Sequence, residues 1–110
     1  MTTIDSMTIG QSAEVATVVT SRAIELFAEA TGDMNPVHLD EQIASKSQFG
    51  GRIAHGMLTA GFVSAAIASK LPGPGSIYLG QTLRFTKPVR IGDTITVKLE
   101  VVEVISAKPL

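Results

Sequence analysis

The hydrophobic and polar positions in the first third of the chain predict one strand followed by one helix. Residues 12–19 are rich in β-branched side chains and partly alternate between apolar and polar positions, which is typical of a strand. Over residues 24–31, apolar side chains recur at the spacing of a helical face, and Thr20 or Ser21 can cap the start of that helix. Gly32 is placed to end the helix in a left-handed conformation.

The next segment carries the signals of a turn and of a short helix. Pro36 biases Asn35 away from the helical region, so we expect residues 33–37 to form a turn rather than a continued helix. Asp40 follows this turn and can cap a short helix over residues 40–46.

Residues 56–69 are the most unusual stretch of the chain because they contain no charged side chain. At the standard rise, a helix over this stretch is roughly 20–24 Å long, which falls short of a membrane span. A helix that is apolar nearly all round belongs inside a protein. Its small residues let another element, most simply a curved sheet, pack very close to it (Ala60, Gly61, Ser64, Ala65, Ala66, Ala68).

The sequence pattern of the last third of the chain predicts β-strands. Residues 77–87 and 94–105 have strand-like patterns, and the second stretch alternates clearly between apolar and polar positions. Residues 71–75, rich in Pro and Gly, separate these strands from the helix, and residues 88–93 join the two strands. The order of elements predicts one α+β domain over residues 1–110, in which an antiparallel sheet wraps around a long hydrophobic helix.

The composition narrows the classes of function. With 110 residues the chain can form one core. A formal net charge of -1 gives no electrostatic footprint for nucleic acid or for an anionic membrane, so we expect neither partner. The absence of cysteine excludes disulfides, thiolate metal sites and cysteine nucleophiles. The N-terminal residues lack the pattern of a signal peptide, so we expect a cytoplasmic location.

Two signals point to chemistry at a single pocket. Asp33 and His38 lie five residues apart on one loop and can form an acid–base pair, although the loop alone favours a capping Asp and a His bonded to the backbone. At the start of the charge-free helix, the N–H of Gly56 has no partner within the helix and can stabilise a negatively charged oxygen. Gly56 alone is more simply a permissive N-cap, whereas the two signals together are more specific.

Other candidate sites are weaker. His38 and His55, with acidic residues nearby, lack the ligand spacing of a zinc site, so we expect no metal. The glycines around Gly73 fit neither a P-loop nor a dinucleotide-binding motif, so we expect no bound nucleotide cofactor. Ser64 is more often a core serine bonded to the backbone, although it can line a pocket.

Four longer motifs follow one another along the chain: FAEATGDMNPVHLD at residues 27–40, IAHGML at 53–58, GSIYLGQTLRF at 75–85 and PVRIGD at 88–93. Together they resemble the motifs of the MaoC-like hydratases, and most of all those of the (R)-specific enoyl-CoA hydratases of polyhydroxyalkanoate synthesis. The resemblance covers about residues 12–108. It implies a homodimer and the hot-dog fold, in which an antiparallel sheet wraps around a long central helix.

The resemblance also implies roles for individual residues. The catalytic Asp/His dyad of the family matches Asp33 and His38, and the oxyanion-hole glycine matches Gly56. Substrate contacts are expected from neighbours of these positions and from the central helix (Asn35, His55, Met57, Ser64, Ile67). The implied reaction is the hydration of trans-2-enoyl-CoA to (R)-3-hydroxyacyl-CoA. It needs no metal and no bound cofactor, since CoA enters as part of the acyl-CoA substrate.

Other readings of the same resemblance stay open. Another hot-dog enzyme of acyl thioesters, a dehydratase or a thioesterase, is the first alternative, and a non-catalytic acyl-CoA-binding module is the second. The family pattern continues beyond Leu110 with two further strands, roughly 20–25 residues at normal strand lengths. A sheet without those strands is expected to have unpaired edges and an incomplete acyl pocket.

Overall fold

The structure is a computed structural model that describes residues 7–105 and has an α+β architecture, as predicted. The ends of the predicted domain, residues 1–6 and 106–110, fall outside the described residues. The elements in chain order are β1 (Ser12–Val18), α1 (Ser21–Thr31), α2 (Pro36–Leu39), α3 (Glu41–Ser45), α4 (Gly56–Ser69) and β2 (Thr94–Glu100).

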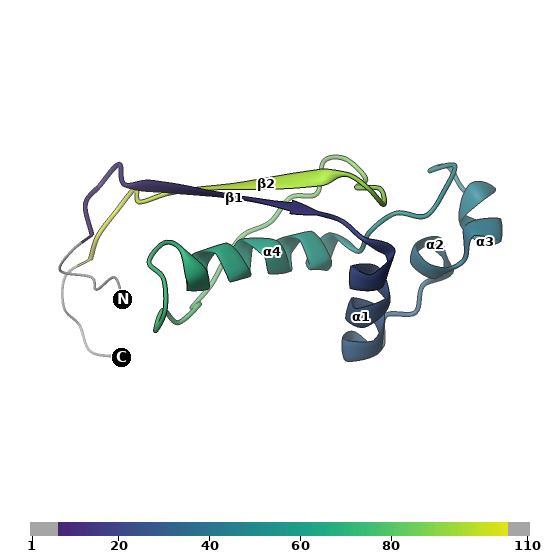
Figure 1. Cartoon of the computed structure of the whole chain (residues 1–110), viewed down its shortest axis with the longest axis horizontal. Helices are drawn as coiled ribbons and strands as arrows, with labels where there is room; N and C mark the ends of the chain where they lie inside the picture. Colours follow the sequence, from purple (N-terminus) through teal and green to yellow (C-terminus); the bar gives the residue numbers. More distant parts are fainter. Residues whose placement is uncertain (1–6, 106–110) are drawn as a thin grey trace.

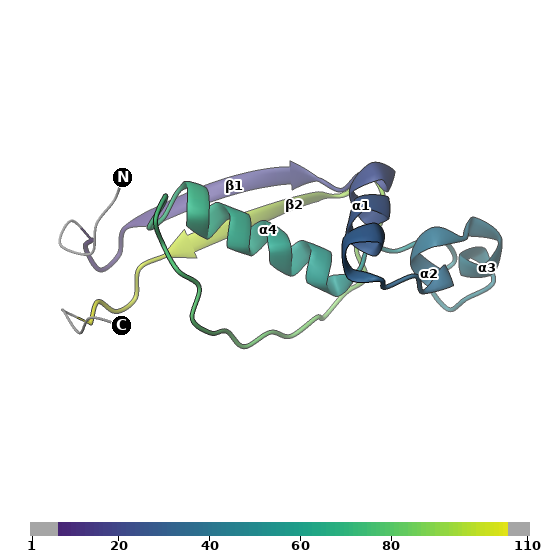
Figure 2. The same cartoon turned by 90° about the horizontal axis from the view of Figure 1, so that it is seen from below.

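The sheet consists of β1 and β2, which pair antiparallel from Ser12 opposite Glu100 to Val18 opposite Thr94. Every second residue of both strands is less exposed, because side chains alternate between the two faces of a strand. The long helix α4 runs beneath both strands, as Figure 1 and the turned view in Figure 2 show. On this inner face Val97 is almost fully buried.

Helix α4 is covered on one side only. The side that packs against the rest of the protein carries the buried residues Leu58, Ala60 and Ala66. The opposite side is exposed over the length of the helix, although it carries no charge (Met57, Gly61, Ser64, Ala65, Ala68). The expectation of a helix buried all round is therefore wrong within residues 7–105, because the two strands can cover only one face.

The predicted strand over residues 77–87 is also wrong in the described structure. This segment is extended but belongs to no strand, and near it only an isolated antiparallel bridge joins Ile53 to Arg90. Its apolar side chains are exposed, Ile77 at 72% and Leu79 at 73%. An alternating pattern forms a strand only where a second strand supplies hydrogen bonds, and residues 7–105 supply none here. The second predicted strand, residues 94–105, is confirmed only as far as Glu100.

The helix ends agree with the local sequence signals. The hydroxyl of Thr20 accepts a hydrogen bond from the N–H of Ala23 at 3.0 Å, and Gly32 ends α1 with φ of 81°. Asp40 caps α3 by accepting from the N–H of Ile43 at 3.2 Å. The expected turn at residues 33–37 is shorter than predicted. Helix α2 already begins at Pro36, because proline suits the first helical position.

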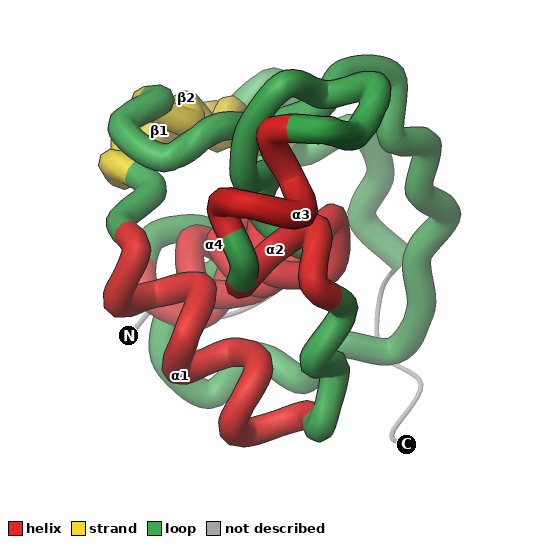
Figure 3. The backbone as a smooth tube through the Cα atoms, turned by 90° about the vertical axis from the view of Figure 1, so that its right-hand side faces the viewer, coloured by secondary structure: helices red, strands yellow, loops and turns green. Residues whose placement is uncertain are grey.

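Helices α1, α2 and α3 gather at the end of the molecule where α4 begins (Figures 1 and 3). A small apolar core joins this end to the sheet, and its buried members are Val19, Ile24, Ala54 and Leu58. This core fixes the loop that follows α1 close to the first residue of α4. Within residues 7–105, no helix has the length and apolar character that a bilayer crossing requires.

Candidate active site

Asp33 lies on the short loop between α1 and α2, directly after the left-handed Gly32. Its own N–H donates to the hydroxyl of Thr31 at 3.2 Å, and its carboxylate accepts from the N–H of Asn35 at 3.3 Å. One carboxylate oxygen is therefore held by the loop. The side chain is exposed, so the second oxygen remains available to water or to a ligand.

His38 lies on α2, whose start is set by Asn35. The side-chain oxygen of Asn35 accepts from the N–H of Val37 at 3.2 Å and caps this helix. The Nδ1 atom of His38 lies 2.8 Å from the carbonyl oxygen of Ile53. Because a carbonyl oxygen only accepts, Nδ1 carries the proton, and Nε2 of a neutral His38 keeps its lone pair as a base.

Arg52 links the segment before α4 to helices α1 and α2. Its Nε donates to the carbonyl oxygen of His38 at 2.7 Å, and its terminal nitrogen donates to the hydroxyl of Ser21 at 3.1 Å. The N–H of Ile53 donates in addition to the carbonyl oxygen of Val37 at 3.2 Å. Sequence reasoning missed Arg52, since a lone arginine after two glycines carries no local signal for these long-range contacts.

His55 directly precedes α4 and is 2% exposed. Its Nε2 lies 3.1 Å from the main-chain carbonyl oxygen of Asp33. Its ring stacks on His38, with 3.9 Å between the ring centroids and 28° between the planes, and it also contacts the ring of Phe27 at 4.6 Å. His55 thus touches both members of the predicted dyad.

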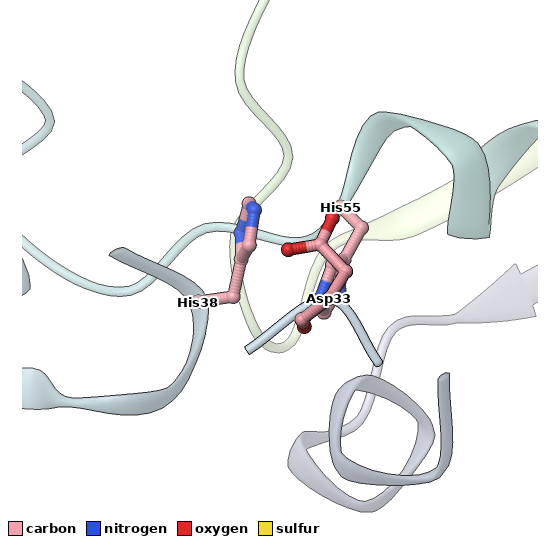
Figure 4. Close-up of side chains that lie close together, drawn as sticks. All are labelled: Asp33, His38 and His55. Carbon is pink, nitrogen blue, oxygen red and sulfur yellow. The ribbon is translucent and has the colours of Figure 1, made fainter. Parts of the chain in front are cut away.

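These residues surround one cavity of about 550 Å³. One carboxylate oxygen of Asp33 and one ring nitrogen each of His38 and His55 all lie within 4.8 Å of one another. Figure 4 shows the three side chains converging from the loop, from α2 and from the start of α4. The full lining is Phe27, Thr31, Asp33, His38, His55, Gly56, Met57 and Phe85. The structure therefore brings together five of the predicted site residues.

The three other predicted site residues lie elsewhere. Asn35 caps α2 and is not part of the cavity lining. Ser64 is exposed on the open side of α4, roughly 12 Å from Gly56 at the rise of a helix. Ile67 lines a different cavity of about 720 Å³ at the far end of α4, next to Leu99 of β2. Within residues 7–105, a ligand beside Asp33 and His38 would have to be elongated to contact Ser64 or Ile67 as well.

The first turn of α4 offers hydrogen-bond donors to the cavity. Within the described residues, the N–H groups of Gly56 and Met57 have no protein acceptor, as expected at a helix start. A Cβ added to Gly56 would lie 3.0–3.1 Å from three ring carbons of Phe85. The ring of Phe85 therefore packs tightly against Gly56, and a side chain at position 56 would require this ring to shift. Sequence reasoning missed this contact because Phe85 was expected only as part of a strand.

Asp33, His38 and His55 are a set from which a metal ion could in principle be held. The lone pair of an imidazole nitrogen lies in the plane of its ring. Two rings that stack at 3.9 Å with planes 28° apart direct their lone pairs side by side rather than at one point. The geometry favours an acid–base site over a metal site, and the expectation of no metal stays a prediction.

Comparison with known proteins identifies relatives of the chain. Residues 6–109 match the MaoC like domain. The chain is 48% identical over 101 residues to a 3-hydroxybutyryl-CoA dehydratase of Methylorubrum extorquens, covering 92% of this chain and 64% of that protein. It is 48% identical over 99 residues to an (R)-specific enoyl-CoA hydratase of Rhodospirillum rubrum, covering 90% of this chain and 69% of the relative.

A solved structure supports the same relationship. The R-hydratase of Pseudomonas aeruginosa, in the unliganded form, superimposes with a TM-score of 0.87 at 55% identity, over 91% of this chain and 64% of the other. This chain thus spans about two thirds of the length of these relatives. The predicted hot-dog fold class and the predicted resemblance are both confirmed. The chain belongs to the MaoC-like domain family.

Proposed function

We propose that this protein is a hydro-lyase that adds water to trans-2-enoyl-CoA and forms (R)-3-hydroxyacyl-CoA. One observation carries the proposal. Within residues 7–105, a carboxylate, an imidazole whose Nε2 has no hydrogen-bond partner and the unpaired N–H groups of a helix start all border one cavity. The names of the relatives, an (R)-specific enoyl-CoA hydratase and a 3-hydroxybutyryl-CoA dehydratase, support it because hydration and dehydration are the two directions of one type of reaction.

In the proposed reaction, Asp33 and His38 hold a water molecule and remove one of its protons. The water oxygen bonds to C3 of the substrate, and the electron pair of the C2–C3 double bond moves toward the thioester, whose oxygen becomes an enolate. The N–H of Gly56 donates to that oxygen. The enolate then collapses, and C2 takes a proton from the dyad, so that the elements of water have been added across C2 and C3.

The rate enhancement of an enzyme requires both the acid–base pair and the oxyanion donor of this site. A positioned acid–base pair typically contributes about 10²–10⁴ in rate, and one oxyanion donor about 10²–10³. Neither contribution alone reaches the rate enhancement of a typical enzyme, which is at least about 10⁶. The start of α4 adds the positive end of a 14-residue helix beside the developing negative charge.

The substrate is proposed to lie with its reacting carbons at the dyad and its acyl chain along the open apolar side of α4. That side leads from Met57 past Gly61 to Ser64, and it carries no charge. No further cofactor is proposed, because water is the only co-reactant and CoA is part of the substrate.

We also propose a homodimer in the cytoplasm, in which a second copy covers exposed apolar side chains such as Ile77 and Leu79.

The test is a spectrophotometric assay of purified protein with enoyl-CoA substrates of increasing chain length, followed by analysis of the product's stereochemistry. Loss of the enoyl absorbance with formation of the (R)-3-hydroxyacyl product is the expected result. Release of free CoA in a thiol assay would instead identify a thioesterase. Tight binding of acyl-CoA without turnover would identify a non-catalytic module, and the proposed function would then be wrong.

A further inference from the structure

We propose that His55 is a positioning residue that holds both members of the dyad, and that it does so as the neutral tautomer with its proton on Nε2. The proposal rests on the proposed function for its kinetic consequence, whereas the tautomer follows from the hydrogen bonds alone. Sequence reasoning expected His55 to contact substrate. With 2% exposure, His55 has little surface for such a contact, and its ring is instead surrounded by other residues of the protein.

The hydrogen bond to the loop assigns the proton on His55. Nε2 lies 3.1 Å from the main-chain carbonyl oxygen of Asp33, and a carbonyl oxygen can only accept, so Nε2 must donate. Among the described residues, Nδ1 of His55 is buried and has no hydrogen-bond partner. A second proton on Nδ1 would be a buried donor without an acceptor, which is costly. The geometry therefore points to an uncharged ring.

The same ring fixes the two catalytic groups by different contacts. The hydrogen bond to the carbonyl oxygen of Asp33 anchors the loop that presents the carboxylate. The stacked contact at 3.9 Å limits the rotation of the His38 ring, whose other support is the bond from Nδ1 to Ile53. The ring of Phe27 packs against the ring of His55, with 4.6 Å between the ring centroids, and keeps His55 in place.

The neutral state of His55 has a further consequence for the reaction. When the dyad removes a proton from water, His38 can become positively charged while its ring stacks on His55. A neutral aromatic face tolerates an adjacent cation, whereas a second imidazolium at this distance would repel it. An uncharged His55 therefore supports the proton transfer without taking part in it.

Two substitutions separate the two contacts. In His55→Gln, the side-chain amide can place an N–H donor near the position of Nε2, but the aromatic stack is lost. In His55→Phe, the aromatic ring remains but the donor to Asp33 is lost. A small displacement of a catalytic group costs up to about 10² in rate, so we expect kcat to fall by about that factor in His55→Phe with little change in KM. Partial recovery of kcat is expected in His55→Gln.

The proposal is tested by nuclear magnetic resonance of the whole chain, labelled with ¹⁵N at histidine and with ¹³C at the main-chain carbonyl of aspartate, combined with the kinetics of both variants. The expected spectrum of the wild type shows a protonated Nε2 and an unprotonated Nδ1 for His55. In His55→Phe the signal of the Asp33 carbonyl carbon is expected to shift, which reports the lost hydrogen bond without any assay of activity.

An Nδ1-protonated or doubly protonated His55 in the wild type would overturn the proposal, and so would wild-type kcat in folded His55→Phe. If neither variant folds, the wild-type spectrum still decides the tautomer. If the wild type hydrates no enoyl-CoA, the proposed function fails, yet the spectrum and the Asp33 signal still show whether His55 holds the loop.

Discussion

Replacing Gly56 by alanine tests the geometry at the start of α4. The added Cβ would lie 3.0–3.1 Å from three ring carbons of Phe85, whereas ordinary contact begins at 3.4 Å. Either the phenyl ring or the helix start must therefore move by a few tenths of an ångström. Gly56 does not have a positive φ, so alanine fits the backbone itself and the perturbation is one of space.

The cost to folding is expected to be small. Alanine is favoured over glycine inside a helix by roughly 0.5–1 kcal/mol. Phe85 is 57% exposed, so its ring can move and give way at a cost of similar size. The free energy of unfolding, measured by urea denaturation, is therefore expected to change by less than about 1 kcal/mol.

The cost to activity is expected to be large. The methyl group and the displaced ring both enter the space in front of the Gly56 N–H, where the thioester oxygen must approach within about 2.7–3.1 Å. Loss of one such donor typically lowers kcat by about 10²–10³. We therefore expect kcat/KM for crotonyl-CoA to fall by about that factor in Gly56→Ala, as measured from the loss of enoyl absorbance.

A matched set of variants separates the two possible causes. Phe85→Leu and the double variant Gly56→Ala/Phe85→Leu remove the ring from the contact. If the methyl group itself blocks the oxygen, the double variant stays much less active than Phe85→Leu. Full recovery in the double variant would show that the displaced ring caused the loss. Wild-type kcat/KM in folded Gly56→Ala would refute the assignment of the Gly56 N–H to the oxyanion.

Two other substitutions test the surroundings of the site. Asn35→Ala removes the cap of α2, so we expect a loss of about 1 kcal/mol in the free energy of unfolding. In Asn35→Asp, which keeps an acceptor at the cap, most of this stability should remain. Unchanged stability of Asn35→Ala in urea denaturation would speak against the cap. Ser64→Leu adds bulk to the open side of α4, and it should lower kcat/KM for long enoyl-CoA substrates more than for crotonyl-CoA. Equal effects on both, with Ser64→Ala as the control, would place the acyl chain elsewhere.

The features that could be predicted from sequence are those with local causes. The caps at Thr20 and Asp40 and the left-handed Gly32 depend on residues three or four positions away, and all three are confirmed. The charge-free stretch predicted α4 with nearly correct bounds. These signals are short-range hydrogen bonds and side-chain periodicity, which a single sequence displays directly.

The features that could not be predicted depend on partners distant in sequence. Residues 77–87 alternate like a strand, but alternation describes the side chains and does not supply a neighbouring strand. The bond from Arg52 to Ser21 spans 31 positions, and the ring of Phe85 lies against Gly56. No periodicity encodes such contacts. The burial of His55 was missed for the same reason, since its neighbours come from α1, from the loop and from α2.

The prediction that Asp33 and His38 lie close to the start of α4 rested on the resemblance rather than on the sequence of the loop itself. On local chemistry alone, that loop is a turn with a capping aspartate, and the structure shows those turn contacts as well. The same hydrogen bonds that make it a turn also hold the carboxylate and the imidazole at the cavity. The structural and the functional interpretations therefore describe one arrangement.

The most direct test of the dyad is the rate of crotonyl-CoA hydration in Asp33→Asn and His38→Asn. Asparagine at position 33 can still accept from the N–H of Asn35, and at position 38 its amide can still donate toward Ile53, so both variants should fold. Glu29→Gln, the same kind of change at an exposed carboxylate of α1, is the matched control and should keep wild-type turnover.

We predict that each dyad variant loses about 10²–10⁴ in kcat while its circular dichroism spectrum and its urea midpoint stay close to those of the wild type. Near-wild-type turnover in either folded variant would contradict the assignment of Asp33 and His38 as the acid–base pair.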